Sequence, residues 1–318
     1  MDGVGSVIPP RPMRARVGLS ACLTGAKVRY DGRDKQDALP HALLDALFDY
    51  VPLCPEVAIG LGVPRPPIQL VGDGLRARGV QDAALDPTDA LRRYGAEVAA
   101  DVLQGVCGYI FMRGSPSCGV VQVPVHDGQG GVARDGRGVF AAAVMQHLPW
   151  LPVAENDAFE QVDAREHFLT RVFALAHWRA MVSEGLSAAA LIGFHSRYKF
   201  LVMAYSNAAY RSAGQLLANL RGDVATISEV YIQLLLTTFA RPVTRRGHAN
   251  ALQHLTGFVK DRVDNAERLR LAEAIDAYRL GDAPLMEPRT LLLELLRRAP
   301  DDYALAQVYL EPFPRLLA

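Results

Sequence analysis

The chain has 318 residues, half of them hydrophobic, with 34 basic and 34 acidic residues. This length and composition argue against a disordered chain and predict a folded, soluble protein with two domains of ordinary size. The N-terminal stretch contains no apolar core of signal-peptide length, and no later apolar run reaches the roughly 18 residues of a membrane span. We therefore expect a cytoplasmic protein with no membrane association.

Short apolar runs alternate with helical patterns between Val17 and about Pro152. In chain order these segments are RARVGLSACL (14–23), PHALLDALFDYV (40–51), VPLCPEVAIGLG (51–62), DALRRYGAEVAADVL (89–103), GVCGYIFM (105–112) and GVFAAAVMQHL (138–148). Strands separated by amphipathic helices imply a mostly parallel sheet. We predict an α/β, Rossmann-like domain over residues 14–158, preceded by a flexible, Pro-rich tail over residues 1–13.

The pattern changes to long helical segments after LPWLPVAEND (148–157). These are DAREHFLTRVFALAHWRAMV (163–182), SAAALIGFHSRYKFLVMAYS (187–206), SEVYIQLLLTTFA (228–240), ANALQHLTGFVKDRV (249–263), NAERLRLAEAIDAYRLG (265–281) and EPRTLLLELLRRA (287–299). Turn and cap signals such as TRRG and LGDAP separate them. We predict an all-helical domain over residues 159–318.

The zero net charge conceals a difference between the two halves. Residues 1–160 carry 15 basic and 18 acidic side chains, whereas residues 161–318 carry 19 and 16. Within the second half, residues 195–262 hold nine basic side chains and three acidic ones. Such a stretch is compatible with a surface that binds phosphates. A solvated helix surface would have the same composition, so charge alone leaves both interpretations open.

Three of the four cysteines follow predicted strands. Cys22, Cys54 and Cys118 come directly after VGLSA, YVPL and GYIFMRGSPS, where the ligands of a parallel sheet bind. Three thiolates are one short of a closed zinc or cubane site and would leave a position open to substrate. Spacing alone leaves open an iron-sulfur or zinc site, thiol catalysis, or unrelated buried cysteines. Cys107, inside an apolar run, is predicted to be a small core residue.

Three ordered motifs resemble the thiouracil desulfidase family (DUF523). They are SACLTG with YDG shortly after it, CPEVAIGLGVPRPP, and SPSCG. The resemblance covers roughly residues 14–155. It implies a 4Fe-4S cluster held by Cys22, Cys54 and Cys118, with one iron open to the sulfur of a thiocarbonyl.

The second half resembles the DUF1722 (YbgA-like) domain that is often fused to this desulfidase. The motifs are FHSRYKFLVMAYS, RRGHANALQHLTGFVK and QVYLEPFP. Two-domain proteins of this arrangement are associated with removing sulfur from 4-thiouridine in tRNA, whereas single-domain members act on free thiouracil. The resemblance therefore implies tRNA as the substrate.

Besides the cysteines, four residues of the first half are candidates for catalysis or substrate binding. Glu56 is the carboxylate best placed to activate water, although Pro55-Glu56 also fits the start of a helix. Ser117 could hydrogen-bond that water or a developing oxyanion, or simply belong to a turn. Asp31 and Arg65 are candidate substrate-binding or supporting groups, with turn and surface roles as the alternatives.

For RNA, the useful side chains are cations that meet phosphates. The candidates in the second half are His195, Arg197, Lys199, Arg245, Arg246 and His248. Together the observations predict a non-redox, 4Fe-4S-dependent desulfidase that converts 4-thiouridine in tRNA to uridine and releases sulfide. The alternatives are a desulfidase of free 2- or 4-thiouracil and a non-catalytic, metal-containing RNA-binding protein. No obligate protein partner is expected.

Overall fold

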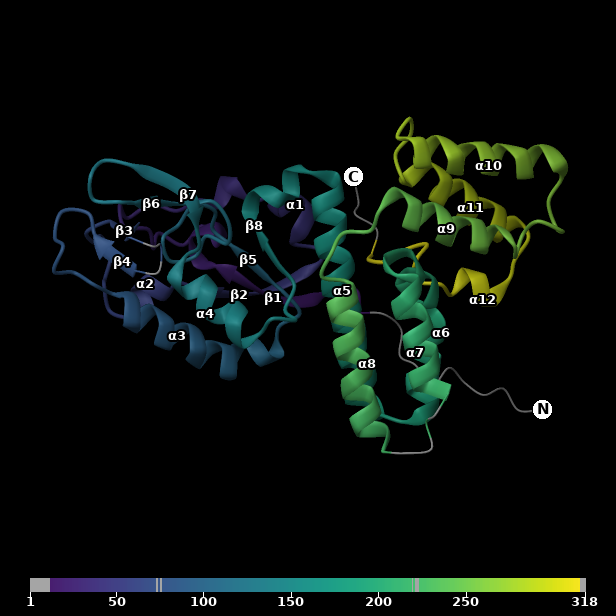
Figure 1. Ribbon diagram of the computed structural model, residues 1–318, viewed down its shortest axis with the longest axis horizontal. Helices are drawn as coiled ribbons and strands as arrows, with labels where there is room; N and C mark the ends of the chain where they lie inside the picture. Colours follow the sequence, from purple (N-terminus) through teal and green to yellow (C-terminus); the bar gives the residue numbers. More distant parts are fainter. Residues whose placement is uncertain (1–11, 73, 75, 219, 221–222, 315–318) are drawn as a thin grey trace. The chain divides into compact units, whose positions relative to one another are not determined.

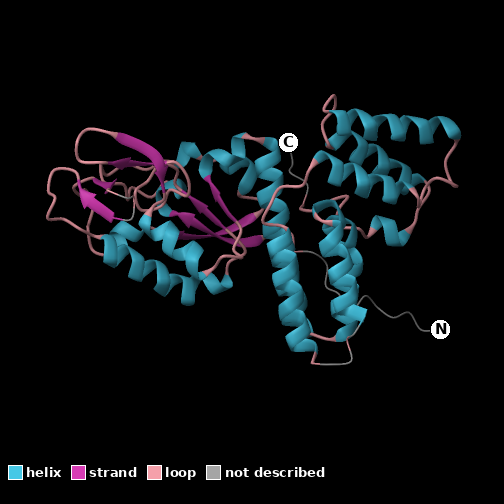
Figure 2. Ribbon diagram, in the orientation of Figure 1, coloured by secondary structure: helices cyan, strands magenta, loops and turns pink. Residues whose placement is uncertain are grey.

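The computed structural model describes residues 12–72, 74, 76–218, 220 and 223–314 (Figure 1). The chain divides into two compact units: Met13–Val172 forms the core of one, and the other begins at Phe173. The division lies later in the chain than the expected boundary after residue 158. The predicted tail over residues 1–13 lies almost entirely outside the described residues. Within the described part, all strands belong to the N-terminal unit (Figure 2).

The N-terminal unit contains the predicted parallel sheet. Its four strands lie in the order β2 (Phe48–Leu53), β1 (Ala15–Ser20), β5 (Tyr109–Phe111) and β8 (Val153–Glu155), and every neighbouring pair is parallel. Residues 17–20 of β1 are all buried, as expected for a central strand that is covered on both faces. The α/β fold class is confirmed.

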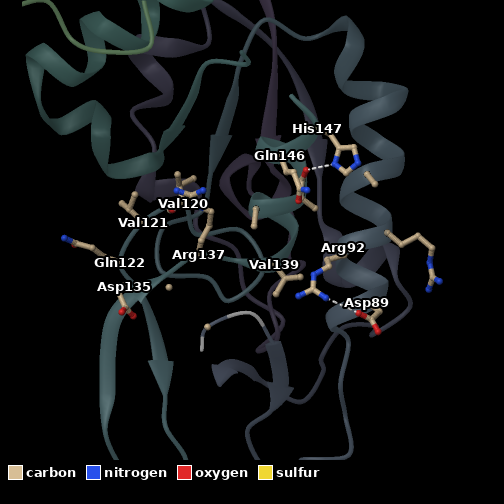
Figure 3. A pocket seen from close by; sticks show the side chains of 16 residues that line it. Asp89, Arg92, Val120, Val121, Gln122, Asp135, Arg137, Val139, Gln146 and His147 are labelled. Carbon is tan, nitrogen blue, oxygen red and sulfur yellow. Dashed lines mark hydrogen bonds and ion pairs between the residues drawn. The ribbon is translucent and has the colours of Figure 1, made fainter. Parts of the chain in front are cut away.

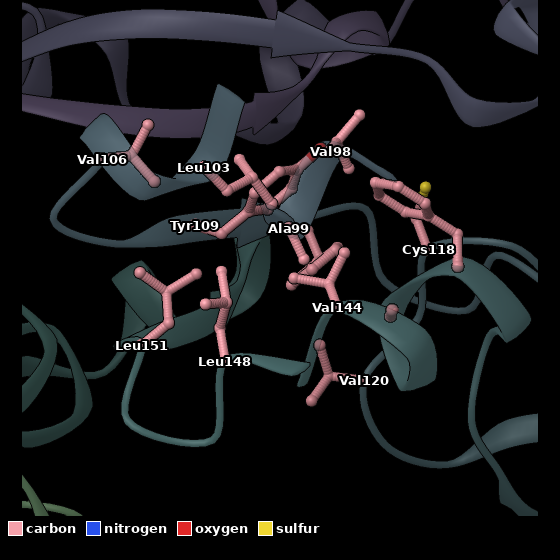
Figure 4. Close-up of a cluster of buried hydrophobic side chains, with 13 residues drawn as sticks. Val98, Ala99, Leu103, Val106, Tyr109, Cys118, Val120, Val144, Leu148 and Leu151 are labelled. Atoms are coloured by element: carbon pink, nitrogen blue, oxygen red, sulfur yellow. The ribbon is translucent and has the colours of Figure 1, made fainter. Parts of the chain in front are cut away.

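Two helices, α3 (Thr88–Ala100) and α4 (Val139–His147), cover one face of this sheet. Figure 4 shows how Val98 and Ala99 of α3 and Val144 of α4 meet the buried ring of Tyr109 on β5. The ring also lies over β1, where a Cβ on Gly18 would come within 2.3 Å of it. Glycine at position 18 therefore lets β1 pair with β5 while the Tyr109 ring occupies the space that a larger side chain would fill.

The same unit contains a second sheet that the sequence did not predict. Its strand order is β4 (Arg76–Gly79), β3 (Ile68–Val71), β6 (Val123–His126) and β7 (Val132–Gly136), with two antiparallel hairpins joined by the parallel pair β3–β6. One face buries Leu70, Val123 and Val125 against Leu91 of α3 and Val139 of α4. The sheet thereby places the segment before α4 beside the end of β5.

The second unit is helical, as predicted. Its helices are the later part of α5 (Val162–Gly185), α6 (Ala188–Tyr205), α7 (Asn207–Ala218), α8 (Val224–Thr238), α9 (Arg245–Thr256), α10 (Asn265–Leu280), α11 (Met286–Arg298) and α12 (Asp302–Leu305). Side-chain caps mark the starts of α6, α8, α9, α10 and α12, and at α10 Asp264 and Glu267 form a capping box. Phe194 stacks on Tyr198, and Trp178 stacks on Tyr231 in the core. Among the described residues, none of the helices combines the length and hydropathy needed to cross a membrane.

Candidate active site

The three cysteines that follow strands line one cavity of about 340 Å³. Cys22 lies in a 3-10 turn (Ala21–Thr24) directly after β1, and Cys54 is the N-cap residue of α2 (Pro55–Ala58) directly after β2. Cys118 ends the loop after β5. Because parallel strands end at the same edge of a sheet, their following loops converge there. We call this space the thiol cavity.

The loop that carries Cys118 is held by its own side chains and by α4. The Ser115 hydroxyl accepts hydrogen bonds from the backbone N–H of Ser117 at 3.2 Å and of Cys118 at 3.1 Å. A Cβ on Gly138, just before α4, would lie 2.5 Å from the carbonyl carbon of Ser117. Glycine at this position therefore lets α4 begin directly against the loop. The backbone fixes the direction of the Cys118 side chain.

Burial shifts the pKa of all three thiols upward. It raises the pKa of Cys22 to about 11 and raises the pKa of Cys54 as well. Burial and the charge of Glu56 raise the pKa of Cys118 well above its usual range. Arg29 opposes the shift at Cys22, and Arg65 opposes it at Cys54. A positively charged group in the cavity would reverse this balance and release the thiol protons.

Glu56 has both carboxylate oxygens in hydrogen bonds. The Ser117 hydroxyl donates to Oε1 at 2.6 Å, and Nε of Arg65 donates to Oε2 at 2.7 Å. The side chains of Arg65 and Glu56 are only 3% and 14% exposed, so solvent weakens this ion pair little. Ser117 is fully buried and is not part of the cavity wall, whereas Glu56 and Arg65 line it.

Arg65 also connects two loops of the cavity. Its Nη1 donates to the carbonyl oxygens of Val28 and Gly62, both at 2.9 Å. The sequence singled out Arg65 as a substrate-binding or supporting group, and the structure shows it in the cavity wall with an ion pair to Glu56 at 2.7 Å. Asp31, in contrast, forms ion pairs with Arg33 at 3.2 Å and Arg29 at 3.8 Å, and it does not line the cavity.

Several RNA-binding candidates of the helical unit are engaged in internal contacts. Nδ1 of His195 lies 3.2 Å from the Tyr231 hydroxyl, and burial lowers the pKa of His195 to about 4. The Arg245 guanidinium donates to the carbonyl oxygen of Tyr278 at 2.8 Å. Nζ of Lys199 lies 4.7 Å from the ring centroid of Tyr303.

The remaining three candidates differ in exposure. Nδ1 of His248 lies 3.1 Å from the Tyr309 hydroxyl, and burial lowers the pKa of His248 to about 3. Arg197 is half-buried, whereas Arg246, in the first turn of α9, is exposed. The six side chains therefore differ in burial, and Arg245 and Arg246 are the exposed ones among them.

The thiol cavity has wall residues that the sequence did not single out. Arg29, Tyr30 and Lys35 contribute from the segment after Cys22, and Arg113 contributes from the loop after β5. The only sequence signal was their closeness to YDG and GSPSCG, because nothing in the spacing shows that these segments meet.

A larger cavity of about 750 Å³ lies beside α3 and α4 (Figure 3). Arg92 there is paired with Asp89 at 3.2 Å, and Nε of Arg137 donates to the carbonyl oxygen of Val120 at 3.0 Å. Its wall contains no cysteine. Size alone does not identify the site, and the thiol cavity is the one of the two that contains the three cysteines.

The donor set of the thiol cavity, three cysteine sulfurs, is of the kind that iron-sulfur clusters use. In the described part of the chain, no three His, Cys, Asp or Glu side chains are gathered closely enough to hold one metal ion. The three thiols are instead distributed over the wall of a cavity, and the ligands of a cluster bind different irons. Soft sulfur donors favour iron-sulfur centres over hard cations.

Each half of the chain is similar to known proteins. Residues 17–156 match the family described as 2-thiouracil desulfurase, and residues 199–314 match a protein family of unknown function, DUF1722. The uncharacterized protein YbgA of Escherichia coli (strain K12) is 32% identical over 151 residues, which are 47% of this chain and 89% of YbgA. The solved structure of the 4Fe-4S-dependent thiouracil desulfidase TudS is 32% identical, with 47% of this chain and 95% of TudS covered and a TM-score of 0.37. The chain thus belongs to the 2-thiouracil desulfurase family through its N-terminal unit and to the DUF1722 family through its helical unit.

Proposed function

We propose that this protein is a desulfidase that converts the C=S group of a thiolated pyrimidine to C=O, with 4-thiouridine in tRNA as the substrate. The observation that carries the proposal is the convergence of Cys22, Cys54 and Cys118 on one cavity that also contains Glu56. These thiolates would hold a 4Fe-4S cluster with one iron left open. Family membership and the name of TudS support the same chemistry.

The reaction replaces sulfur by oxygen and needs no change of oxidation state. When bound, the cluster supplies a thiophilic, Lewis-acidic iron that draws electron density from the thiocarbonyl carbon. Glu56 takes a proton from a water molecule, whose oxygen forms the new bond to that carbon. The carbon–sulfur bond then breaks and Glu56 returns the proton to the departing sulfur. The second proton of the water leaves the new hydroxyl group as the carbonyl forms, so the balance is C=S plus H₂O giving C=O, HS⁻ and H⁺.

Arg65 and Ser117 act through Glu56 in this scheme. Their hydrogen bonds at 2.7 and 2.6 Å fix the plane of the carboxylate, so its remaining lone pairs have one orientation in the cavity. Fixing the base in this way lowers the entropy cost of reaching the reactive geometry. We therefore assign catalysis to Glu56 and positioning to Ser117 and Arg65.

The proposal of tRNA as the substrate rests on the helical unit. A thiolated base inside a folded tRNA has to be unstacked before its sulfur reaches the cavity, at a cost of a few kcal/mol. Contacts between the phosphate backbone and basic side chains would offset this cost. Among the described basic side chains of residues 195–262, six are exposed: Arg211, Arg241, Arg245, Arg246, Lys260 and Arg262.

Two assays on one anaerobic sample distinguish the proposal from its alternatives. Turnover of 4-thiouridine in tRNA is expected to exceed turnover of free 2- or 4-thiouracil in kcat/KM. The reverse order would make the protein a detoxifying enzyme of free thiouracil. One zinc per chain, without iron or labile sulfide, would instead identify a non-catalytic RNA-binding protein.

A further inference from the structure

The side chain of Tyr109 on β5 carries a buried hydroxyl group that has no hydrogen-bond partner in the described part of the chain. The residue as a whole is 0% exposed. An unpaired polar atom inside a protein costs free energy, because it has lost its water without gaining another partner. A phenylalanine would fill the same space without this cost. Packing therefore explains the ring of Tyr109 but not its hydroxyl group.

The direction of the hydroxyl group is fixed by the contacts of the ring. The ring of Phe111 stacks on it with a centroid distance of 4.0 Å, and the ring of Phe140 meets it edge-on at 6.2 Å. Gly18 of β1 leaves room for the remaining edge of the ring. The side chain is thus enclosed by the core, and the hydroxyl group cannot turn outward to reach solvent.

Cys118 lies between this core and the thiol cavity. Its side chain belongs to the same hydrophobic cluster as Tyr109 (Figure 4) and also lines the cavity. Burial, and after it the charges of Cys118, Tyr94 and Cys54, raise the pKa of Tyr109 well above its usual range. The phenol is therefore protonated at neutral pH, and two of the three thiols of the cavity are among its neighbours.

Ser20 is a second hydroxyl group in this region. It is 2% exposed, lines the thiol cavity, and accepts the backbone N–H of Met112 at 3.0 Å. It opposes the upward pKa shifts of both Tyr109 and Cys118, so it neighbours both. Among the described residues, however, no hydrogen bond of ordinary length and angle joins its oxygen to the Tyr109 hydroxyl. The chain thus provides a donor at this place without an acceptor.

Building on the proposed desulfidase function and its cluster, we infer that the Tyr109 hydroxyl donates a hydrogen bond to sulfur at the Cys118 corner of the cluster site. Sulfur atoms of a bound cluster are the acceptor that the protein alone lacks there. A donor to these sulfurs withdraws electron density from the irons and makes the open iron a stronger Lewis acid. Tyr109 thereby tunes the cofactor, whereas Glu56 acts on the water.

The reduction potential of the cluster tests the inference without any turnover. In full-length, anaerobically reconstituted protein, Tyr109→Phe removes only the hydroxyl group. It is expected to make reduction about tenfold less favourable, which is a shift of about 59 mV to lower potential for a one-electron couple.

Tyr50→Phe is the matched control. Tyr50 of β2 also has a buried hydroxyl group without a hydrogen-bond partner among the described residues, but it lines a different cavity, beside Arg14 and Asp49. The potential of this variant is expected to equal that of the wild type.

A second measurement separates this role from a purely structural one. Without the cluster, Tyr109→Phe removes an unpaired polar atom, so the urea midpoint of the variant is expected to equal or exceed that of the wild type. With the cluster bound, the same change removes a hydrogen bond, and an iron chelator is expected to extract the iron about tenfold faster. A packing defect would instead weaken both states. A buried water as the partner of the hydroxyl group would lower the midpoint and leave the extraction rate unchanged, and either result would overturn the inference.

The outcome for Tyr109 is distinguishable from the outcome for the proposed function. A wild-type potential in Tyr109→Phe protein of full iron and sulfide content would overturn the inference, and so would an equal shift in Tyr50→Phe. With a thiolated substrate, kcat of Tyr109→Phe is expected to fall by about tenfold, and an unchanged kcat would contradict the effect on the open iron. Absence of turnover in cluster-loaded wild-type protein would refute the proposed function, and the potential would still decide the role of Tyr109. A protein that binds no cluster would refute both.

Discussion

Glu56 is the residue on which the proposed chemistry depends most, because both of its carboxylate oxygens are held by fixed donors. Glu56→Gln keeps the size of the side chain but removes the proton acceptor. We expect kcat to fall by about 10²- to 10⁴-fold, while iron and labile sulfide per chain stay at the wild-type level. Glu97→Gln, at an exposed position of α3, is the control and is expected to have no effect. Full activity of Glu56→Gln would remove the carboxylate from the reaction.

The cysteines provide a second test at the residue scale. Cys118→Ala is expected to prevent assembly of the cluster, because it removes one of the three thiols that line the cavity. Cys107 is 5% exposed within an apolar run and does not line that cavity. Cys107→Ala is therefore expected to keep the iron content and to lose about 1 kcal/mol of unfolding free energy. Iron analysis after anaerobic reconstitution checks both variants. An equal iron content in both would contradict the proposed ligand set.

At the scale of the element, helix α9 contains a buried histidine whose titration affects stability. Burial lowers the pKa of His248 to about 3, whereas an unfolded histidine titrates near pH 6.5. Below pH 6.5 the unfolded chain binds the proton more readily, so stability is complete above this value and decreases as the pH falls toward 3. The contribution of His248 to the slope of the unfolding free energy against pH approaches about 1.4 kcal/mol per pH unit.

His248→Gln is expected to reduce this dependence, to which His167 and His195 also contribute because burial lowers the pKa of each to about 4, and His254→Gln, at an exposed position of the same helix, is expected to preserve it. Urea unfolding between pH 7 and 4.5 measures both slopes. Identical slopes in the two variants would show that His248 is not buried in its neutral form.

The start of α9 also distinguishes two adjacent arginines. Both side chains are exposed, but the Arg245 guanidinium donates to the carbonyl oxygen of Tyr278, so a substitution at Arg246 changes the surface charge without removing this bond. Arg246→Glu is therefore expected to weaken tRNA binding and to reduce the slope of log K against log salt by about one. Arg270→Glu introduces the same charge change on α10, outside the basic stretch, and is expected to leave the slope nearly unchanged. Equal slopes in the two variants would exclude Arg246 from an RNA interface.

At the scale of the whole molecule, the sequence predicted the parallel sheet, the helical second unit and the edge where the cysteines meet. These predictions succeeded because strand and helix periodicities are local, and because parallel strands end together. The second sheet was missed since its strands have only four or five residues and every residue of β7 except Gly136 is exposed. The pairing of Arg65 with Glu56 was also missed. It depends on how the chain turns between them, which no spacing rule determines.

The central claim is that the thiol cavity removes sulfur from a thiolated pyrimidine. The most direct measurement incubates cluster-loaded, full-length protein with tRNA that contains 4-thiouridine under anaerobic conditions, and follows the absorbance of the thionucleoside and the release of sulfide together. We predict that one sulfide appears for each 4-thiouridine that becomes uridine, and that the Cys118→Ala protein releases none. Intact 4-thiouridine after incubation with protein of full iron and sulfide content would contradict the claim.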